Sequence, residues 1–377
     1  MNMRILYVVN DANFFLSHRL PLALAAQGEG FDVHVATPQS NDVEKLLAKR
    51  LTFHPIPLTR RGISLGEEMA SIIALYRLYR KVKPDLVHLV TIKPVLYGGI
   101  AARLAGVPAV VSAVTGLGYV FIAQGLKASV MRLFVKGAYR FALGHTNGRV
   151  IFQNPDDRSS FLKSRLIDAS QTVLIKGSGV DMAQFTPTPE PPGSPLVVFA
   201  ARMLWDKGVG EFVEAAKYLC ELGIDARFAL VGDTDSGNPA AVPKSQLERW
   251  QQSGVVEWWG QHTNMPMVFA QSHIVALPSA YGEGVPKVLI EAAACGRPIV
   301  TTDTPGCREI VRHDENGLLV PVRDVAALAE ALRRLIEDAV LRRRMGARGR
   351  EIAIAEFSVE TVMSETLDVY RRLLSAE

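Results

Sequence analysis

The sequence predicts two α/β domains of similar size, each built on a doubly wound parallel sheet. Its 377 residues exceed the size at which one hydrophobic core usually stops growing. A composition of 48% hydrophobic and 21% charged residues is typical of a globular protein. Short apolar runs alternate with helical stretches in both halves, and a proline-rich segment separates the halves.

The first half contains apolar runs of strand length, each followed by a longer segment. The predicted strands are 4–10, 32–38, 85–91, 109–115 and 149–154. Helices are predicted over 16–28 and over 64–84, the second ending at Pro84, because proline cannot continue a helix. This alternation favours a parallel sheet whose crossovers are helical.

A break follows at 185–196, FTPTPEPPGSPL, where five prolines stand between 187 and 195. Proline continues neither a helix nor a central strand, so we expect the interdomain linker here. Strands are then predicted at 196–202, 226–233, 255–260, 274–279, 298–303 and 317–321. The predicted division is 1–187, 188–357 and a C-terminal helix over 358–377.

Charge is distributed unevenly. The net charge of +4 divides into +11 for residues 1–180 and −7 for the rest, which indicates that the first half faces something anionic. Residues 104–126 carry no charge and could span a bilayer, but Pro108 and several glycines favour a buried strand followed by a loop. The three cysteines show no paired or metal-type spacing, so a reducing compartment is expected.

The stretch GEGVPKVLIEAAACG places two carboxylates, Glu283 and Glu291, around a predicted helix start. Pro286 suits the first turn of this helix and Gly296 its end. A helix start of this kind exposes backbone amides that bind anions. The alternative is that Glu283 caps the helix and Glu291 is an ordinary surface residue.

Two cations follow the first strand of the second half. Arg202 ends the strand and Lys207 lies in the loop before the next helix. Such a pair can neutralise a diphosphate. The alternative is a solvated loop pair.

Taken together, Arg202, Lys207, Glu283 and Glu291 resemble the motif of the retaining sugar-nucleotide glycosyltransferases of family 4. The R-x4-K and E-x7-E spacings and the blocks at 278–300 and 305–320 carry the resemblance. It implies the GT-B fold, with two facing Rossmann-like domains and a final helix that crosses back to the first. It also implies a nucleotide-sugar donor and no metal or other cofactor.

The resemblance assigns roles to individual residues. Arg202 and Lys207 would hold the diphosphate, Glu283 would contact the transferred sugar and Glu291 the ribose. The remaining donor-side residues are Gly284, Val285, Pro286 and Lys287 beside the phosphates, and Gly260 and His262 beside the base. The catalytic set is Glu283, Arg202, Lys207 and His18.

Three segments of the first half, 10–23, 114–143 and 150–162, resemble bacterial enzymes that extend lipid-diphosphate-linked sugars. The similarity is to N-acetylgalactosaminyltransferases acting on undecaprenyl-diphosphate-linked sugars. It implies a UDP-N-acetylhexosamine donor, with UDP-GalNAc as the first candidate, and a polyprenyl-diphosphate-linked acceptor. The expected location is the cytoplasmic face of the inner membrane, with no nucleic-acid partner.

The acceptor side departs from the family pattern. Thr115 and Gly116 stand where many members have a histidine, and Asn13-Phe14-Phe15 replaces a double glycine. The acceptor-side candidates are Asp11, Asn13, His18, Lys93, Thr115 and Gly116. His18 is expected on the opening turn of the first helix, and a packed histidine is the alternative.

A basic helix is predicted over 127–143, with Lys127, Arg132, Lys136 and Arg140 along one side and apolar residues between them. Such a helix suits an anionic membrane surface. A packed helix with solvated lysines is the alternative.

Three other motifs are present, and two other functions are alternatives for this sequence. Asp233-Thr234-Asp235 resembles a metal-binding motif, Gly116-Leu117-Gly118 is half of a dinucleotide fingerprint, and 341–351 is a basic helix face. The rival enzyme is a UDP-GlcNAc 2-epimerase of the same fold. The rival non-enzyme is a nucleotide-sugar-binding regulatory protein.

Overall fold

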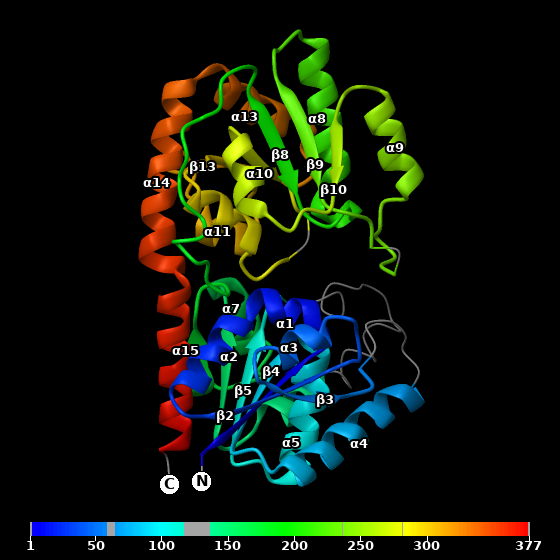
Figure 1. The fold of residues 1–377 in the computed structure, drawn as a ribbon, viewed down its shortest axis with the longest axis vertical. Helices are drawn as coiled ribbons and strands as arrows, with labels where there is room; N and C mark the ends of the chain where they lie inside the picture. The colour runs from blue at the N-terminus through cyan, green and yellow to red at the C-terminus, as the bar shows by residue number, and fades with distance from the viewer. Residues whose placement is uncertain (1, 59–64, 117–135, 236, 281, 376–377) are drawn as a thin grey trace. The chain divides into compact units, whose positions relative to one another are not determined.

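The computed structural model describes the whole chain except residues 1, 59–64, 117–135, 236, 281 and 376–377. The chain forms two compact units (Figure 1). The first unit comprises Met1–Ser178 and Glu360–Glu377, and the second comprises Gly179–Val359. Both are α/β units built on parallel sheets, so the predicted fold class is confirmed.

The first unit holds a seven-stranded sheet in the order β3-β2-β1-β4-β5-β6-β7. Its strands are β1 (Arg4–Val9), β2 (Asp32–Thr37), β3 (Thr52–Pro55), β4 (Leu86–Val90), β5 (Ala109–Val114), β6 (Gly148–Phe152) and β7 (Thr172–Leu174). Strand β1 lies inside the sheet next to the central strand β4 and pairs Ile5 with both Val33 and Leu86. Its residues are apolar without alternation because helices cover both faces of the sheet.

Helices cover the two faces in separate groups. One group packs on the face that carries Ile5 and Tyr7. It consists of α1 (Ala12–His18), α2 (Leu20–Gly28), α3 (Val43–Leu47) and α15 (Val359–Leu374). The other group packs on the face that carries Leu6 and Val8. It consists of α4 (Leu65–Val82), the π-helical turn η1 (Pro94–Gly98), α5 (Gly99–Ala105), the helical residues 136–143 and α7 (Pro155–Lys163). A short η3 turn (Ala169–Gln171) precedes β7.

The single helix predicted over 16–28 is wrong. The segment lies in two helices, α1 and α2, that meet at Arg19. Pro21 stands in the first turn of α2, where it lacks an N–H and its ring clashes with a preceding carbonyl, so α1 has to end before it.

The C-terminal helix α15 belongs to the first unit, as predicted (Figure 1). Its apolar side chains join the core on the β1 face. The hydroxyl of Tyr370 lies 2.5 Å from Nδ1 of buried His88 and donates to the hydroxyl of Tyr7 at 3.1 Å. The last helix is therefore tied to the two central strands, β1 and β4.

The second unit holds a six-stranded sheet in the order β10-β9-β8-β11-β12-β13. Its strands are β8 (Leu196–Ala200), β9 (Arg227–Val231), β10 (Glu257–Gly260), β11 (Ile274–Leu277), β12 (Ile299–Thr302) and β13 (Gly317–Val320). Its helices are η4 (Trp205–Lys207), α8 (Val209–Glu221), α9 (Lys244–Gln252), α10 (Met265–Gln271), α11 (Lys287–Ala294), α12 (Pro305–Ile310), α13 (Val325–Glu337) and α14 (Ala339–Phe357). The strand order reverses between β8 and β11, and ligands of doubly wound sheets bind at this point.

The proline-rich segment at 185–196 lies inside the second unit and does not separate the units. Its prolines prevent regular structure, but its polar groups still anchor it. Glu190 forms an ion pair with Arg342 at 2.9 Å, and the carbonyl of Pro191 lies 3.0 Å from Nε2 of His273. The chain passes between units at 178–179 and again at 359–360.

Within 104–126, residues 109–114 form the fully buried strand β5, and 117–126 lie outside the described residues. Across the described ranges, no helix combines the length and apolar character needed to cross a membrane.

Candidate functional site

The site lies in the second unit, at the carboxyl ends of β8 and β11. Arg202 follows β8, Lys207 ends the short turn η4, and Glu283 follows β11. These strands are neighbours on either side of the point where the strand order reverses. The topology therefore brings together residues that are about 80 positions apart in the sequence.

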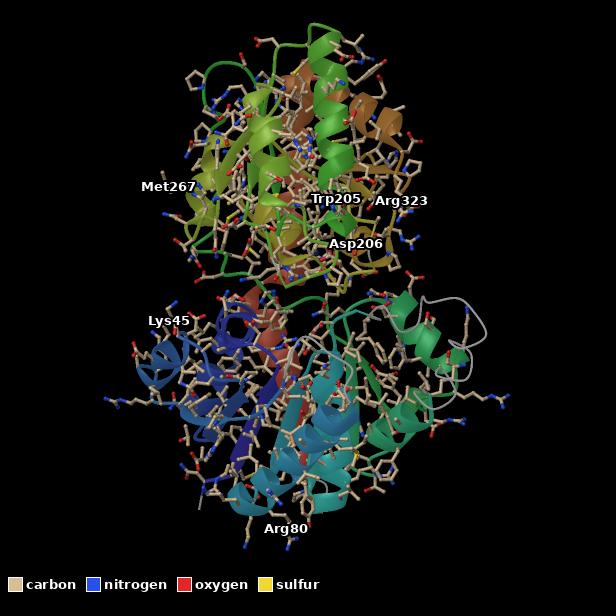
Figure 2. All side chains as sticks on the ribbon, turned by 90° about the vertical axis from the view of Figure 1, so that its right-hand side faces the viewer. Lys45, Arg80, Trp205, Asp206, Met267 and Arg323 are labelled. Carbon is tan, nitrogen blue, oxygen red and sulfur yellow. The ribbon has the colours of Figure 1, made fainter. Side chains whose placement is uncertain are left out.

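Close backbone packing joins the loop after β8 to the loop after β11. Gly208 has a φ of +79°, and a Cβ at this position would lie 2.1 Å from the carbonyl oxygen of Pro278. The carbonyl of Asp206 accepts hydrogen bonds from the Ala280 amide at 2.9 Å and from Ser279 Oγ at 3.3 Å. Trp205 and Asp206 of this turn are labelled in Figure 2. Only glycine at position 208 allows the two loops to meet.

Lys207 and Glu283 form an ion pair at this junction. Lys207 Nζ lies 2.5 Å from Glu283 Oε1, and both side chains are only 16% exposed. Ser279 Oγ donates to the same carboxylate oxygen at 3.0 Å. The lysine is therefore not the solvated loop residue of the alternative interpretation. A cation and a carboxylate are held together where a charged ligand is expected.

The loop that carries Glu283 also packs against α12. A Cβ on Gly306 would lie 1.7 Å from the carbonyl oxygen of Gly284, so the two backbones touch. The adjacent thiol of Cys307 is buried, and burial together with the nearby Glu283 charge raises the pKa of Cys307 to about 11. This thiol is protonated at neutral pH and is not a nucleophile.

Helix α11 begins directly after this loop. Pro286 is its N-cap, one position earlier than the predicted first turn, and no side chain caps the helix. Gly296, with a φ of +69°, follows the C-cap and ends the helix as predicted. Glu283 is therefore not a helix cap, because its carboxylate pairs with Lys207 instead.

Glu291 lies one turn inside α11 and is buried, so it is not an ordinary surface residue. Burial raises the pKa of its carboxyl group, and Lys287 partly offsets this effect. Lys287 Nζ lies 3.4 Å from Glu291 Oε1. The first turns of α11 thus carry a second cation–carboxylate pair.

The loops after β9 and β10 complete this edge of the sheet. Arg202 Nη1 donates to Asp235 Oδ2 at 2.8 Å, and Asp233 accepts the amide of Thr234 at 2.7 Å, so both carboxylates of the Asp-x-Asp motif have protein partners. Within the described part of the chain, no group of three or more His, Cys, Asp and Glu side chains is arranged to hold a metal ion.

Gly260, with a φ of +70°, ends β10, and its carbonyl accepts the amide of Gly232 at 2.7 Å. His262 is exposed two residues later. The positions expected beside a nucleotide base therefore lie at the same sheet edge as the charged residues.

In the first unit, the acceptor-side candidates fall into two groups. Asp11 caps α1 by accepting the Phe14 amide at 2.7 Å, and Asn13 is exposed beside it. His18, however, is the last residue of α1 and not part of its opening turn. Its ring stacks on Phe14 at 4.1 Å and its Nδ1 lies 2.7 Å from Ser17 Oγ. Helix α1 therefore carries His18 away from the strand ends.

Lys93, Thr115 and Gly116 follow the ends of β4 and β5, which are neighbouring strands. Lys93 Nζ pairs with Glu68 of α4 at 3.0 Å, with both side chains largely buried. Gly116 has a φ of 138°.

Sequence reasoning missed Thr91 at the same place. This β-branched residue adopts a φ of 75°, and its buried hydroxyl has no hydrogen-bond partner among the residues that the structure describes. Backbone strain of this kind concentrates at functional sites, but no motif in the sequence predicts it. The roles of Asp235, Ser279 and Cys307 as neighbours of the charged residues were also missed. Asp235 and Cys307 follow other strands, and no motif marks Ser279 in the loop of Glu283.

The predicted membrane-facing residues are only partly described. Lys127 and Arg132 lie outside the described residues, whereas Lys136 and Arg140 belong to the helical residues 136–143. Arg140 Nε donates to the carbonyl of Arg165 at 2.7 Å.

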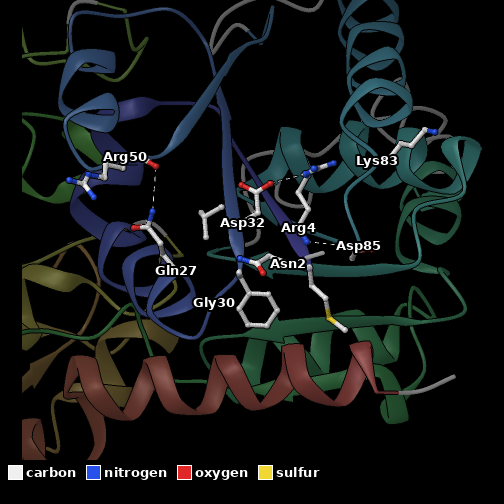
Figure 3. Close-up of a pocket in the computed structure, with 11 residues that line it drawn as sticks. Asn2, Arg4, Gln27, Gly30, Asp32, Arg50, Lys83 and Asp85 are labelled. Atoms are coloured by element: carbon white, nitrogen blue, oxygen red, sulfur yellow. Dashed lines mark hydrogen bonds and ion pairs between the residues drawn. The ribbon is translucent and has the colours of Figure 1, made fainter.

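A separate polar hollow lies at the amino ends of β1 and β2 (Figure 3). Arg4 spans it by pairing with Asp32 at 3.0 Å and by donating its amide to Asp85 at 2.6 Å. This edge is opposite to the one at which doubly wound sheets bind ligands, and Arg4 and Asp32 pair with each other there. We assign it a structural role.

Known protein families match most of the chain. Residues 182–352 match the family of glycosyl transferases group 1, and residues 4–154 match the glycosyl transferase 4-like family. The chain is 27% identical to the N,N'-diacetylbacillosaminyl-diphospho-undecaprenol alpha-1,3-N-acetylgalactosaminyltransferase of Campylobacter jejuni, over 96% of this chain and 98% of that protein. It is 28% identical to the UDP-Gal:alpha-D-GlcNAc-diphosphoundecaprenol alpha-1,3-galactosyltransferase of Escherichia coli, over 91% and 89%.

Solved structures resemble the whole chain. The sucrose-phosphate synthase of Thermosynechococcus elongatus superposes with a TM-score of 0.81 at 20% identity, covering 100% of both chains. Anabaena Alr3699/HepE in complex with UDP and glucose gives 0.78 at 21% identity, covering 98% of this chain and 100% of that one. The chain therefore belongs to the glycosyltransferases, with the GT-B fold and domains of the group 1 and 4-like families.

Proposed function

We propose that this glycosyltransferase moves an N-acetylhexosamine, with GalNAc as the first candidate, from a UDP-sugar to a polyprenyl-diphosphate-linked saccharide. The observation that carries the proposal is the Lys207–Glu283 pair beside α11 at the switch point of the second sheet. The named substrates of the Campylobacter jejuni and Escherichia coli relatives support the acceptor class.

The two ion pairs suit a ligand that carries both phosphate and hydroxyl groups. A diphosphate would attract Lys207 and Arg202 and would lie near the N-terminal end of α11, where the helix dipole favours negative charge. Glu283, held by Ser279, would then accept a hydroxyl of the transferred sugar. Glu291 would accept the ribose hydroxyls as a buried carboxylate. Each acid thus lies beside a cation, Glu283 beside Lys207 and Glu291 beside Lys287.

The same cations support the chemical step. When the bond between the sugar's anomeric carbon and the phosphate oxygen breaks, negative charge develops on the leaving diphosphate, which Lys207 and Arg202 stabilise. The acceptor hydroxyl forms the new bond to the anomeric carbon on the same face and gives its proton to the leaving phosphate oxygen. Configuration is thereby retained without an enzymic nucleophile, in keeping with the protonated Cys307 thiol. No metal ion is part of this scheme.

The test is a donor screen in the presence of a polyprenyl-diphosphate monosaccharide. The purified protein is incubated with UDP-GalNAc, UDP-GlcNAc, UDP-galactose, UDP-glucose or GDP-mannose, with and without a strong chelator, and nucleotide release is recorded. We expect acceptor-dependent UDP release from one UDP-N-acetylhexosamine, unaffected by the chelator. Release without acceptor, or tight nucleotide binding without any turnover, would overturn the proposal.

The stereochemistry is tested on the product of the same reaction. Proton NMR of the new linkage is expected to show an α-anomer formed from the α-linked donor. Inversion to the β-anomer, or a sugar trapped covalently on a side chain, would contradict the front-face step.

A further inference from the structure

Helix α4 carries apolar side chains on the face that points away from its own core. Met69, Ile73 and Tyr76 are 54%, 43% and 37% exposed. With Arg80 they are spaced by three or four residues, which places all four along one stripe of the helix. The opposite face, with Leu75 and Tyr79, is buried against the sheet. The packing of the first unit therefore does not account for the exposed stripe.

Two neighbouring helical segments also expose large apolar side chains. Helix α5 packs against α4, and the helical residues 136–143 pack against α5, where Arg103 Nη1 donates to the carbonyl of Phe141 at 2.8 Å. These two segments expose Leu104 and Phe141, at 58% and 41%. The guanidinium of Arg103 lies 4.4 Å from the centre of the Phe141 ring. Large apolar side chains thus stand outward on three adjacent helices.

The helical segments that carry these apolar side chains are basic. The cations of these three helical segments and of the residue after α4 are Arg77, Arg80, Lys81, Lys83, Arg103, Lys136 and Arg140. Figure 2 shows Arg80 projecting from the end of α4 away from the unit. Acidic residues occur only in the first turn of α4, and one of them, Glu68, already pairs with Lys93. We call the exposed apolar residues together with these cations the α4 face.

We propose that the α4 face docks onto a membrane that contains anionic lipid. Charge complementarity selects this partner, because basic side chains with long apolar stems reach phosphate headgroups while Met69, Ile73 and Tyr76 enter the interface. The inference deepens the proposed function, since an acceptor on a polyprenyl chain resides in a membrane. The Glu68–Lys93 pair also joins the first turn of α4 to the end of β4, where the acceptor-side candidates lie.

The test measures co-sedimentation of the full chain with vesicles of phosphatidylcholine alone or with 30% phosphatidylglycerol, a mixture chosen for about one charge in three lipids. One variant combines Met69→Ser, Ile73→Ser and Tyr76→Ser, and another combines Arg77→Gln, Arg80→Gln and Lys81→Gln. Control variants on the second unit are Leu222→Ser with Met267→Ser, and Arg333→Gln with Arg334→Gln, all at exposed positions.

We expect the wild type and both controls to bind the anionic vesicles, and each α4 variant to bind about tenfold more weakly or worse. Unchanged circular dichroism and melting temperature show that the variants are folded. Equal binding by the α4 variants, or no vesicle binding by the wild type, would overturn the inference. An α4 variant that converts a dimer to a monomer while binding vesicles normally would assign the face to a second copy instead.

A second readout separates this inference from the proposed function. Transfer to a water-soluble acceptor with a short prenyl chain is expected to be equal in the wild type and the α4 variants. Transfer to a long-chain acceptor in vesicles is expected to fall in the α4 variants alone. Absence of transfer by the wild type to either acceptor would count against the proposed function and leaves the vesicle-binding result as the test of the α4 face.

Discussion

Lys207 and Glu283 are held in contact in a largely desolvated position. Removing both charges from water costs free energy, and this cost can exceed the gain from their attraction. A nucleotide diphosphate arriving at this point supplies a stronger partner for the lysine and leaves the carboxylate to accept a sugar hydroxyl. The pair thus holds both side chains in place for the substrate.

Replacing Lys207 by Met is expected to lower kcat/KM by about 10²- to 10³-fold, because developing charge on the leaving diphosphate loses its stabilisation. Glu283→Gln is expected to lower kcat more than it raises KM. Steady-state kinetics with the best donor measures both effects. Lys217→Met, at an exposed position on α8, is the control and is expected to retain full activity. Wild-type rates in Lys207→Met would remove this residue from the site.

The raised pKa of Glu291 predicts how donor binding depends on pH. The carboxylate accepts hydroxyl protons only when it is ionised, and its protonation sets in at a higher pH than for an ordinary glutamate. The KM for the donor is therefore expected to rise as the pH falls, earlier than an unperturbed glutamate would cause. Initial rates between pH 8 and pH 5 measure this KM. In Glu291→Gln the KM is expected to be higher throughout and not to change with the protonation of residue 291. An identical pH profile in both proteins would contradict the assignment.

At the scale of elements, the site depends on how closely α12 approaches the loop before α11. Gly306→Ala places a Cβ 1.7 Å from a backbone carbonyl, so the loop or the helix has to shift. We expect at least tenfold weaker donor binding in a protein that still folds, since misplacement of binding groups by about 1 Å has effects of this size. Gly282→Ala is the matched control, because nothing lies within 4 Å of its added methyl group. Equal loss of binding in both variants would show that the loop tolerates no change, whatever its contact with α12.

Central strands and edge strands differed in how well the sequence predicted them. Strands β1, β4 and β8 are buried on both faces, so their largely apolar runs predict them. The edge strands β3 and β7 have four and three residues and are partly exposed, which leaves no apolar pattern to detect.

The predictability of the site follows the same logic. The motif spacings marked Arg202, Lys207, Glu283 and Glu291, because they sit in loops with recognisable turn and helix signals. The contact of Arg202 with Asp235 and that of Gly306 with the loop of Glu283 arise only when separate strands come together, so no local pattern encodes them. Ser279 lies only four residues before Glu283, but no motif marks it as a partner. His18 was misplaced because the helix break at Arg19 was not anticipated.

At the scale of the whole chain, α15 fastens the C-terminal segment to the centre of the first sheet. Burial, and then the charge of Arg19, hold the pKa of His88 well below its ordinary value, so the folded chain keeps this ring neutral beside Tyr370. Below about pH 6.5 the unfolded chain takes up a proton that the folded chain does not, so stability falls as the pH falls.

The melting temperature is therefore expected to decrease from pH 7 to pH 5, with a loss of up to ~1.4 kcal/mol per pH unit from this histidine. In His88→Gln the dependence on pH is expected to be shallower, although the variant is less stable overall. Calorimetry across this range measures both. A His88→Gln protein with the same pH slope as the wild type would show that other groups cause the acid sensitivity.

The measurement that tests the central claim most directly is calorimetric titration of UDP into the wild type, Lys207→Met, Arg202→Met and Arg227→Met. Arg227 is an exposed arginine of the same sheet at the amino end of β9, where it pairs with Glu257. A donor site at the carboxyl ends of β8 and β11 predicts one UDP per chain, weakened at least tenfold by Lys207→Met and Arg202→Met and unchanged by Arg227→Met. Wild-type affinity in both site variants would place the nucleotide elsewhere and contradict the account.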